Sequence, residues 1–331
     1  MTMRGIGITT VCLLLLMSCS SSGNKKSKYS GKTTLSAPYE LLVVTDKDWL
    51  GSDEGEVLMD LLKSDVPALP QPEANFKVIS VNPSDFSNQF RGFANILIIK
   101  TGKEYKQPKL SLAKDVYAHP QKVLTLTAPN GQAVAELVLK SGDQILSVFV
   151  EAELEREYSV LLKSNSDVVK QQAEKQFGYT MLAPKDIKSV KEGDNFFWAS
   201  SMERDNMLNV CMYSYELNDT MDVFSMENFL LHRNAFMGKN VQGDTEKEYM
   251  TTQMMGLEGE VVSRNGVMIM EVRGLWEMTN APMGGPFVSY TQIDSAENRV
   301  VVAEGFVFAP QTKKRDLIRE LEASLRSVKK M

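Results

Sequence analysis

The sequence contains few of the side chains on which most enzyme chemistry depends. Its 331 residues include 3 cysteines and 2 histidines, and His119 and His232 lie far apart in the chain. Neither histidine belongs to an HExxH motif or to a Cys/His spacing that predicts a zinc site. Walker A, Gly-x-Gly-x-x-Gly and Gly-x-Ser-x-Gly motifs are also missing, which argues against common nucleotide-binding and serine-hydrolase sites. We therefore expect neither a metal nor a cofactor.

The chain also lacks a basic excess. It has 37 Lys and Arg against 42 Asp and Glu, which gives a formal net charge of −5. Proteins that bind nucleic acid neutralise phosphates with basic surfaces, so no nucleic-acid partner is predicted. Hydrophobic residues make up 43% and charged residues 24% of the chain, as in ordinary globular proteins, and its length favours two domains.

No apolar run is long enough to span a bilayer, because a membrane helix needs about 20 apolar residues. Residues 6–17 are free of charge and follow Arg4, which is typical of the hydrophobic region of a secretory signal. The run ends in Leu16-Met17-Ser18-Cys19, which resembles the lipobox of bacterial lipoproteins. The resemblance implies cleavage before Cys19 and acylation (a palmitate-type modification) of its sulfur. We therefore expect a signal peptide over residues 1–18 and a lipid anchor at Cys19.

Residues 19–36 are rich in Ser, Gly and Lys and are predicted to form a flexible tether behind the lipidated cysteine. The lysines of this segment either rest on anionic headgroups or act as a solubilising spacer. No Asp or Glu precedes Glu40. Some bacteria use an acidic cluster after the lipidated cysteine to export lipoproteins to the cell surface. By that analogy, the body is expected at the outer membrane facing the periplasm, with the cell surface as the alternative.

The order of apolar periodicities predicts an α+β protein. Residues 37–163 alternate strands with helices, residues 164–178 are predicted to form a bridging helix, and residues 179–331 are mainly antiparallel strands with two packed helices. Gly142 lies inside the long helical pattern that follows residue 130, where we expect a bend. Cys211, in a strand-like segment, is expected to be a small buried core residue, so no intramolecular disulfide is predicted.

Short strings in the C-terminal half resemble a known family. They are Arg273-Gly274-Leu275-Trp276-Glu277, Met283-Gly284-Gly285-Pro286-Phe287 and Gly305-Phe306-Val307-Phe308-Ala309-Pro310, with Lys313-Lys314-Arg315 and Phe196-Phe197-Trp198. Together they resemble an uncharacterised Bacteroidetes-type lipoprotein family, a domain of unknown function. The resemblance implies a lipid-anchored envelope protein with no assigned activity.

The same strings contain the candidate ligand surface. Its members are Arg273, Trp276, Glu277, Gly284, Gly285 and Glu304. In the functional interpretation, Arg273 binds a carboxylate or phosphate, Trp276 stacks on the ligand and the glycines allow it to approach the backbone. In the structural interpretation, which we favour, Arg273 forms an ion pair with Glu304 or Glu271 and the tryptophan packs beside a tight turn.

Two functions follow from these observations. The first is a non-enzymatic binding or scaffold protein, whose partners are the membrane, through the anchor, and an envelope protein or polymer. The alternative is an envelope enzyme that uses Glu271, Arg273, Glu277 and Glu304. Two Asp-Ser/Thr-apolar motifs also resemble the O-glycosylation motif of exported proteins in these bacteria, with Thr220 and Ser295 as the acceptors.

Overall fold

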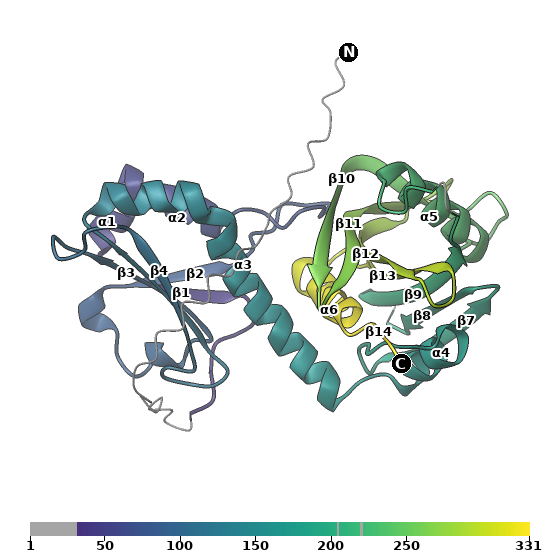
Figure 1. Ribbon diagram of the computed structural model, residues 1–331, viewed down its shortest axis with the longest axis horizontal. Helices are drawn as coiled ribbons and strands as arrows, with labels where there is room; N and C mark the ends of the chain where they lie inside the picture. The colour runs from purple at the N-terminus through teal and green to yellow at the C-terminus, as the bar shows by residue number, and fades with distance from the viewer. Residues whose placement is uncertain (1–31, 204, 219–220) are drawn as a thin grey trace, which may run out of the picture.

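The computed structural model describes residues 32–203, 205–218 and 221–331, which form two units connected by one long helix (Figure 1). The predicted signal peptide, Cys19 and Thr220 lie outside the described residues. Within them, no helix combines the length and the hydrophobicity that a membrane span requires.

The first unit is built on a five-stranded sheet with the order β2-β1-β3-β5-β4. Its strands are β1 (Glu40–Val44), β2 (Lys77–Val81), β3 (Asn95–Thr101), β4 (Lys109–Lys114) and β5 (Lys122–Ala128). Only β4, at the edge, runs antiparallel to its neighbour. The parallel strands are continuous apolar runs because both faces of the sheet are covered.

Different segments cover the two faces of this sheet. Helices α1 (Lys47–Leu50), α2 (Asp53–Leu62) and the first half of α3 (Gly131–Lys163) lie on one face, where Leu58 and Leu62 pack on the core. The β2–β3 connection covers the other face with Phe86, Phe90 and Phe93. This connection holds two 3-10 turns, Pro83–Asp85 and Phe90–Gly92.

Helix α3 leaves the first unit and runs toward the second (Figure 1). Ser141 has non-helical angles, φ −126° and ψ 21°, which confirms the bend expected at Gly142. A Cβ on Gly142 would lie 3.0 Å from Leu61 Cδ1, so the glycine also permits close packing on α2. After the bend, α3 packs against α6 (Arg315–Arg326) of the second unit.

The second unit is built on a seven-stranded antiparallel sheet with the order β10-β11-β12-β13-β9-β8-β7. Its strands are β7 (Ile187–Gly193), β8 (Phe196–Ser201), β9 (Met207–Glu216), β10 (Met250–Arg264), β11 (Val267–Met278), β12 (Gly284–Asp294) and β13 (Arg299–Phe308). A separate pair, β6 (Tyr179–Thr180) and β14 (Lys329–Lys330), joins the C-terminal segment to this unit.

Helices cover both faces of the antiparallel sheet. Helices α6 and α4 (Asp167–Phe177) pack on one face, and α5 (Met226–Asn240) packs on the other. The predicted α+β class, with an alternating first domain and an antiparallel second domain, is therefore confirmed.

The helix expected over 164–178 as a bridge between the domains belongs to the second unit. This helix, α4, contributes Val169, Ala173 and Phe177 to the core of the second unit, while α3 connects the units. The edge strands β4 and β7, whose side chains are mostly exposed, were not predicted; β7 also lacks a period-two apolar pattern.

Candidate functional site

A hollow opens beside the carboxyl ends of β1 and β2 in the first sheet. The connection after β1 leaves for the helical face of the sheet, and the connection after β2 leaves for the opposite face. Since β1 and β2 are parallel neighbours, their two connections diverge at the carboxyl ends of the strands and leave a crevice between them. The hollow has a volume of about 500 Å³ and is lined by residues 46–48 and 82–84.

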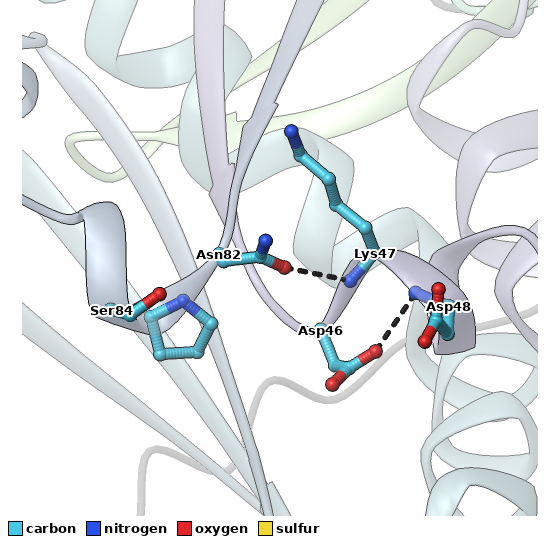
Figure 2. Close-up of a pocket in the computed structure, with 6 residues that line it drawn as sticks. Asp46, Lys47, Asp48, Asn82 and Ser84 are labelled. Carbon is cyan, nitrogen blue, oxygen red and sulfur yellow. Dashed lines mark hydrogen bonds between the residues drawn. The ribbon is translucent and has the colours of Figure 1, made fainter.

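Hydrogen bonds from backbone amides to side-chain oxygens hold the shape of this hollow (Figure 2). Asp46 Oδ1 accepts from the Asp48 amide at 2.8 Å and from the Trp49 amide at 3.2 Å, so it caps α1. Asn82 Oδ1 accepts from the Lys47 amide at 3.1 Å and thereby joins the two loops. One oxygen of each side chain is therefore engaged in building the site.

The other polar groups of the hollow face solvent. Lys47, Asp48 and Ser84 are exposed, and Figure 2 shows the Lys47 ammonium apart from the carboxylates of Asp46 and Asp48. An ammonium, carboxylates, an amide nitrogen and a hydroxyl suit a small ligand rich in hydroxyl or amino groups. Within the described residues, no group of three or more His, Cys, Asp or Glu side chains is placed to hold a metal ion.

The predicted pair between Arg273 and Glu304 is wrong. In the sheet register, Arg273 lies opposite Val288, which lies opposite Gly305, whereas Glu304 lies opposite Ser289. Because successive side chains alternate between faces, Arg273 and Glu304 point to opposite sides of the sheet. Of the carboxylates in the enzyme hypothesis, Glu271 approaches Arg273, with Oε2 4.0 Å from Nη2, and Glu304 does not.

Arg273 instead belongs to a buried ion network beneath α6. Its Nη2 lies 2.5 Å from Glu322 Oε1, and its Nη1 lies 3.1 Å from Oε2. Arg319 Nη1 and Arg326 Nη2 also approach Glu322, at 2.9 Å and 3.5 Å. Burial acts to raise the pKa of Glu322, but Arg273, Arg319 and Arg326 outweigh it and hold the pKa far below its usual range. The network therefore keeps one buried carboxylate ionised.

Trp276 and the two glycines form packed structure. Trp276 is 3% exposed, and its Nε1 donates to the Val307 carbonyl at 3.1 Å. A Cβ on Gly285 would overlap that same carbonyl, and a Cβ on Gly284 would lie 2.8 Å from the Trp276 carbonyl. The glycines thus allow neighbouring strands to approach each other closely. In the functional interpretation they were expected to let a ligand approach the backbone instead.

The remaining predicted positions do not join this cluster. Glu277 is exposed on the face opposite its buried neighbour Trp276. Ser295, a predicted glycosylation acceptor, is exposed in the turn between β12 and β13, so its hydroxyl is sterically accessible.

Glu304 has a partner that the sequence analysis missed. Its carboxylate binds Arg233 of α5, with Oε1 2.7 Å from Nη2 and Oε2 3.0 Å from Nε, and both side chains are fully buried. Arg233 also donates to Thr252 Oγ1 at 2.7 Å and lies 3.8 Å from the ring centroid of Phe287. The available signal was its helical spacing, since Arg233 is four residues from the buried Phe229 and Met237.

Polar contacts from α6 hold the two units together. The Glu73 carboxylate accepts from the backbone amides of Lys314 at 2.7 Å and Arg315 at 3.1 Å, at the start of α6. Arg319 Nη2 donates to Asn75 Oδ1 at 3.2 Å. Residues 73–75 of the first unit therefore satisfy donors of the second unit's last helix.

The acidic segment of α3 contributes Glu151 to the same interface, while Glu153 is bonded within the first unit. Glu151 binds Arg326, with Oε1 2.8 Å from Nη2, and Glu153 is 1% exposed and binds Arg156 at 2.5 Å. Its alternate acids therefore find separate partners around the helix. Glu157 is an exception, because its charge repels Glu320 of α6. Burial, followed by the charges of Glu157 and Asp186, raises the pKa of Glu320 to about 7.

Comparison with solved structures returns only distant likeness. The Ran-binding protein Mog1p of Saccharomyces cerevisiae is 11% identical with a TM-score of 0.33, over 46% of this chain and 90% of that one. A Mog1 point mutant is 13% identical with a TM-score of 0.31, over 46% and 90%. A Bacteroides thetaiotaomicron VPI-5482 protein is 12% identical with a TM-score of 0.26, over 47% and 46%. Similarity at this level says nothing about function.

Family comparison divides the chain where the structure does. No curated protein matches it. Residues 34–161 match the family model of one domain of unknown function, DUF8532, and residues 166–327 match that of another, DUF4837. The two halves of the chain thus match the models of two different domains of unknown function, which is consistent with an uncharacterised family.

Proposed function

We propose that this is a lipid-anchored envelope protein that acts by binding a partner rather than by catalysis. In this proposal, acylated Cys19 holds it at the outer membrane with its body facing the periplasm. The hollow between β1 and β2 binds a hydroxyl- or amine-bearing ligand, such as part of an envelope polymer or protein.

One observation carries the binding proposal. The hollow is an open space of about 500 Å³, a size typical of small-molecule sites, and polar groups of its lining face solvent. By contrast, Arg273, Glu304 and Trp276 each have an internal partner that accounts for their burial. The second unit then serves as the scaffold that α6 and α3 join to the binding unit.

Lipid attachment is tested by labelling with radioactive palmitate. Wild-type protein is expected to incorporate label, and Cys19→Ala is expected to incorporate none and to accumulate as precursor or as soluble protein. Equal labelling of both proteins contradicts the anchor. Orientation is tested by adding protease to intact cells. The body is expected to survive, and its digestion while a periplasmic control stays intact would place it on the cell surface.

The binding site is tested by a conservative pair of substitutions, Lys47→Gln with Asp48→Asn, which leaves the net charge unchanged. The variant is expected to lose capture of envelope polymer or protein from detergent extracts, analysed by mass spectrometry. A matched control, Lys140→Gln with Asp143→Asn on the exposed surface of α3, should retain capture. Retention by both variants rules out the hollow as the binding site.

A further inference from the structure

We infer that a cluster of lysines at one corner of the first unit docks on an anionic phospholipid surface. The lysine corner consists of Lys100, Lys103, Lys106 and Lys109, all exposed. The inference deepens the proposed lipid anchoring by stating which side of the body turns toward the membrane.

The sheet register brings these lysines together. Lys100 on β3 and Lys109 on β4 both pair with Thr127 of β5, from its two sides, so they project from the same face of the sheet. Neighbouring strands are about 4.8 Å apart, which puts their backbones roughly 10 Å apart. The loop from β3 to β4 carries Lys103 and Lys106 across this gap (Figure 1). Four exposed lysines therefore lie along one corner of the first unit.

These charges are not neutralised within the protein. None of the four lysines forms an ion pair with another residue in the described part of the chain. Glu104, the one acid between positions 100 and 109, holds its carboxylate beside Gly102 within the corner, which leaves an excess of about three positive charges there. The chain as a whole carries a net charge of −5, so an anionic surface repels most of the body and attracts this corner.

Protection of a sheet edge does not account for the corner. Natural sheets often carry lysine on an edge strand, where it prevents pairing with another chain. That explains Lys109 on β4, but Lys100 lies on β3, which has a strand on each side, and Lys103 and Lys106 lie in a loop. The cluster extends beyond the edge that would need protection.

The position of the tether favours a membrane as the partner. At the far end of β4, the Thr34 amide donates to the His119 carbonyl and the His119 amide to the Lys32 carbonyl. Residues 20–31, between Cys19 and this point, span at most roughly 40 Å. Strand β4 has six residues and is about 20 Å long, so the anchor and the lysine corner can reach one surface together.

Co-sedimentation with vesicles tests the inference on the unacylated chain from Ser20 to Met331. The vesicles are phosphatidylcholine with about one third phosphatidylglycerol, and pure phosphatidylcholine. Each lysine near an anionic surface strengthens binding about fivefold. The variant with Lys100, Lys103, Lys106 and Lys109 all changed to Gln is expected to bind anionic vesicles about tenfold or more weakly than wild type. Pure phosphatidylcholine should bind neither, and added salt should weaken wild-type binding.

The matched control changes four scattered exposed lysines to Gln. They are Lys63, Lys140, Lys163 and Lys188. The control is expected to bind as wild type, and both variants should melt as wild type does. Equal binding by wild type and the corner variant, or an equal loss in the control, overturns the inference. Binding to soluble polyphosphate in preference to vesicles also overturns it and assigns the corner to a soluble polyanion. Since no acyl chain is present, failure of palmitate labelling leaves this result unaffected.

Discussion

The two units place their charged groups in opposite ways. In the first unit, the polar groups around the hollow and the lysine corner lie at the open ends of parallel strands and in the loops beyond them. In the second unit, helices cover both faces of the antiparallel sheet, and Arg233, Glu304 and Glu322 are buried beneath them. Charges that face water are available to a ligand, whereas buried charges must satisfy each other. This difference is the reason why we propose binding for the first unit and a scaffold role for the second.

The largest expected effect comes from breaking the fully buried pair. Arg233→Ala leaves Glu304 ionised or forces it to take up a proton in a site without exposure, and it removes packing on Phe287. We expect a loss of about 3–5 kcal/mol in the free energy of unfolding, measured by urea denaturation.

The matched variant removes both charges of this pair. Arg233→Met with Glu304→Leu is expected to fall within about 1 kcal/mol of wild type, because an apolar pair avoids desolvation. If the double variant is as unstable as Arg233→Ala, the loss comes from packing and not from the unpaired carboxylate.

Glu322→Gln is expected to lose slightly less free energy of unfolding than Arg233→Ala. Arg273 and Arg326 keep 19% and 15% of their side-chain surface exposed, so water partly compensates the lost carboxylate. We expect a loss of about 3 kcal/mol by urea denaturation, against less than about 0.5 kcal/mol for the exposed Glu277→Gln.

The same carboxylate predicts sensitivity to acid. Its pKa is below the ordinary value of 4.5 in the folded protein, so its contribution to stability is complete above about pH 4.5 and is lost as the pH falls below it. The free energy of unfolding should therefore fall less steeply with decreasing pH in Glu322→Gln than in wild type. An unchanged acid profile would mean that other carboxylates control it.

Glu320 is expected to make stability depend on pH in the opposite direction. Its pKa of about 7 exceeds the ordinary 4.5, so the folded state binds this proton more tightly than the unfolded state. Stability from this group is therefore complete below about pH 4.5 and is lost as the pH rises to about 7. Glu320→Gln should raise the melting temperature at pH 8 more than at pH 5. The exposed Asp143→Asn serves as control, and an equal gain at both pH values would show that Glu320 does not titrate in this range.

The smallest effect on stability is expected at the hollow. Lys47→Gln with Asp48→Asn alters exposed side chains whose backbone contacts remain, so the free energy of unfolding should change by less than about 0.5 kcal/mol. Thermal unfolding of the variant checks this. A large loss of stability would remove the contrast between the two units.

Much of the fold could be predicted because it depends on local patterns. The apolar strands 95–101, 207–216 and 299–308 and the amphipathic helix that ends the chain are recognisable from residues close in sequence. The bend near Gly142 was predictable for the same reason. Edge strands β4 and β7 were not, since exposed strands depend on pairing with a distant partner more than on their own apolar pattern.

The candidate site was predicted less well, for a different reason. Arg273, Trp276, Gly285 and Glu304 were recognised as unusual, but their partners Glu322, Val307 and Arg233 lie 22 to 71 positions away in the chain. The hollow depends on two connections leaving opposite faces of a sheet, which no local motif records.

The sequence alone determined that the protein is an α+β chain with two domains, with an apolar N-terminal run that ends at a cysteine. Periodicity and composition contain this information, because they reflect which residues avoid water. Only the tertiary structure decided which charged side chains form buried ion pairs and which remain exposed to solvent. Strand order and face determine whether a charge meets a partner or water, and both depend on how distant segments pair.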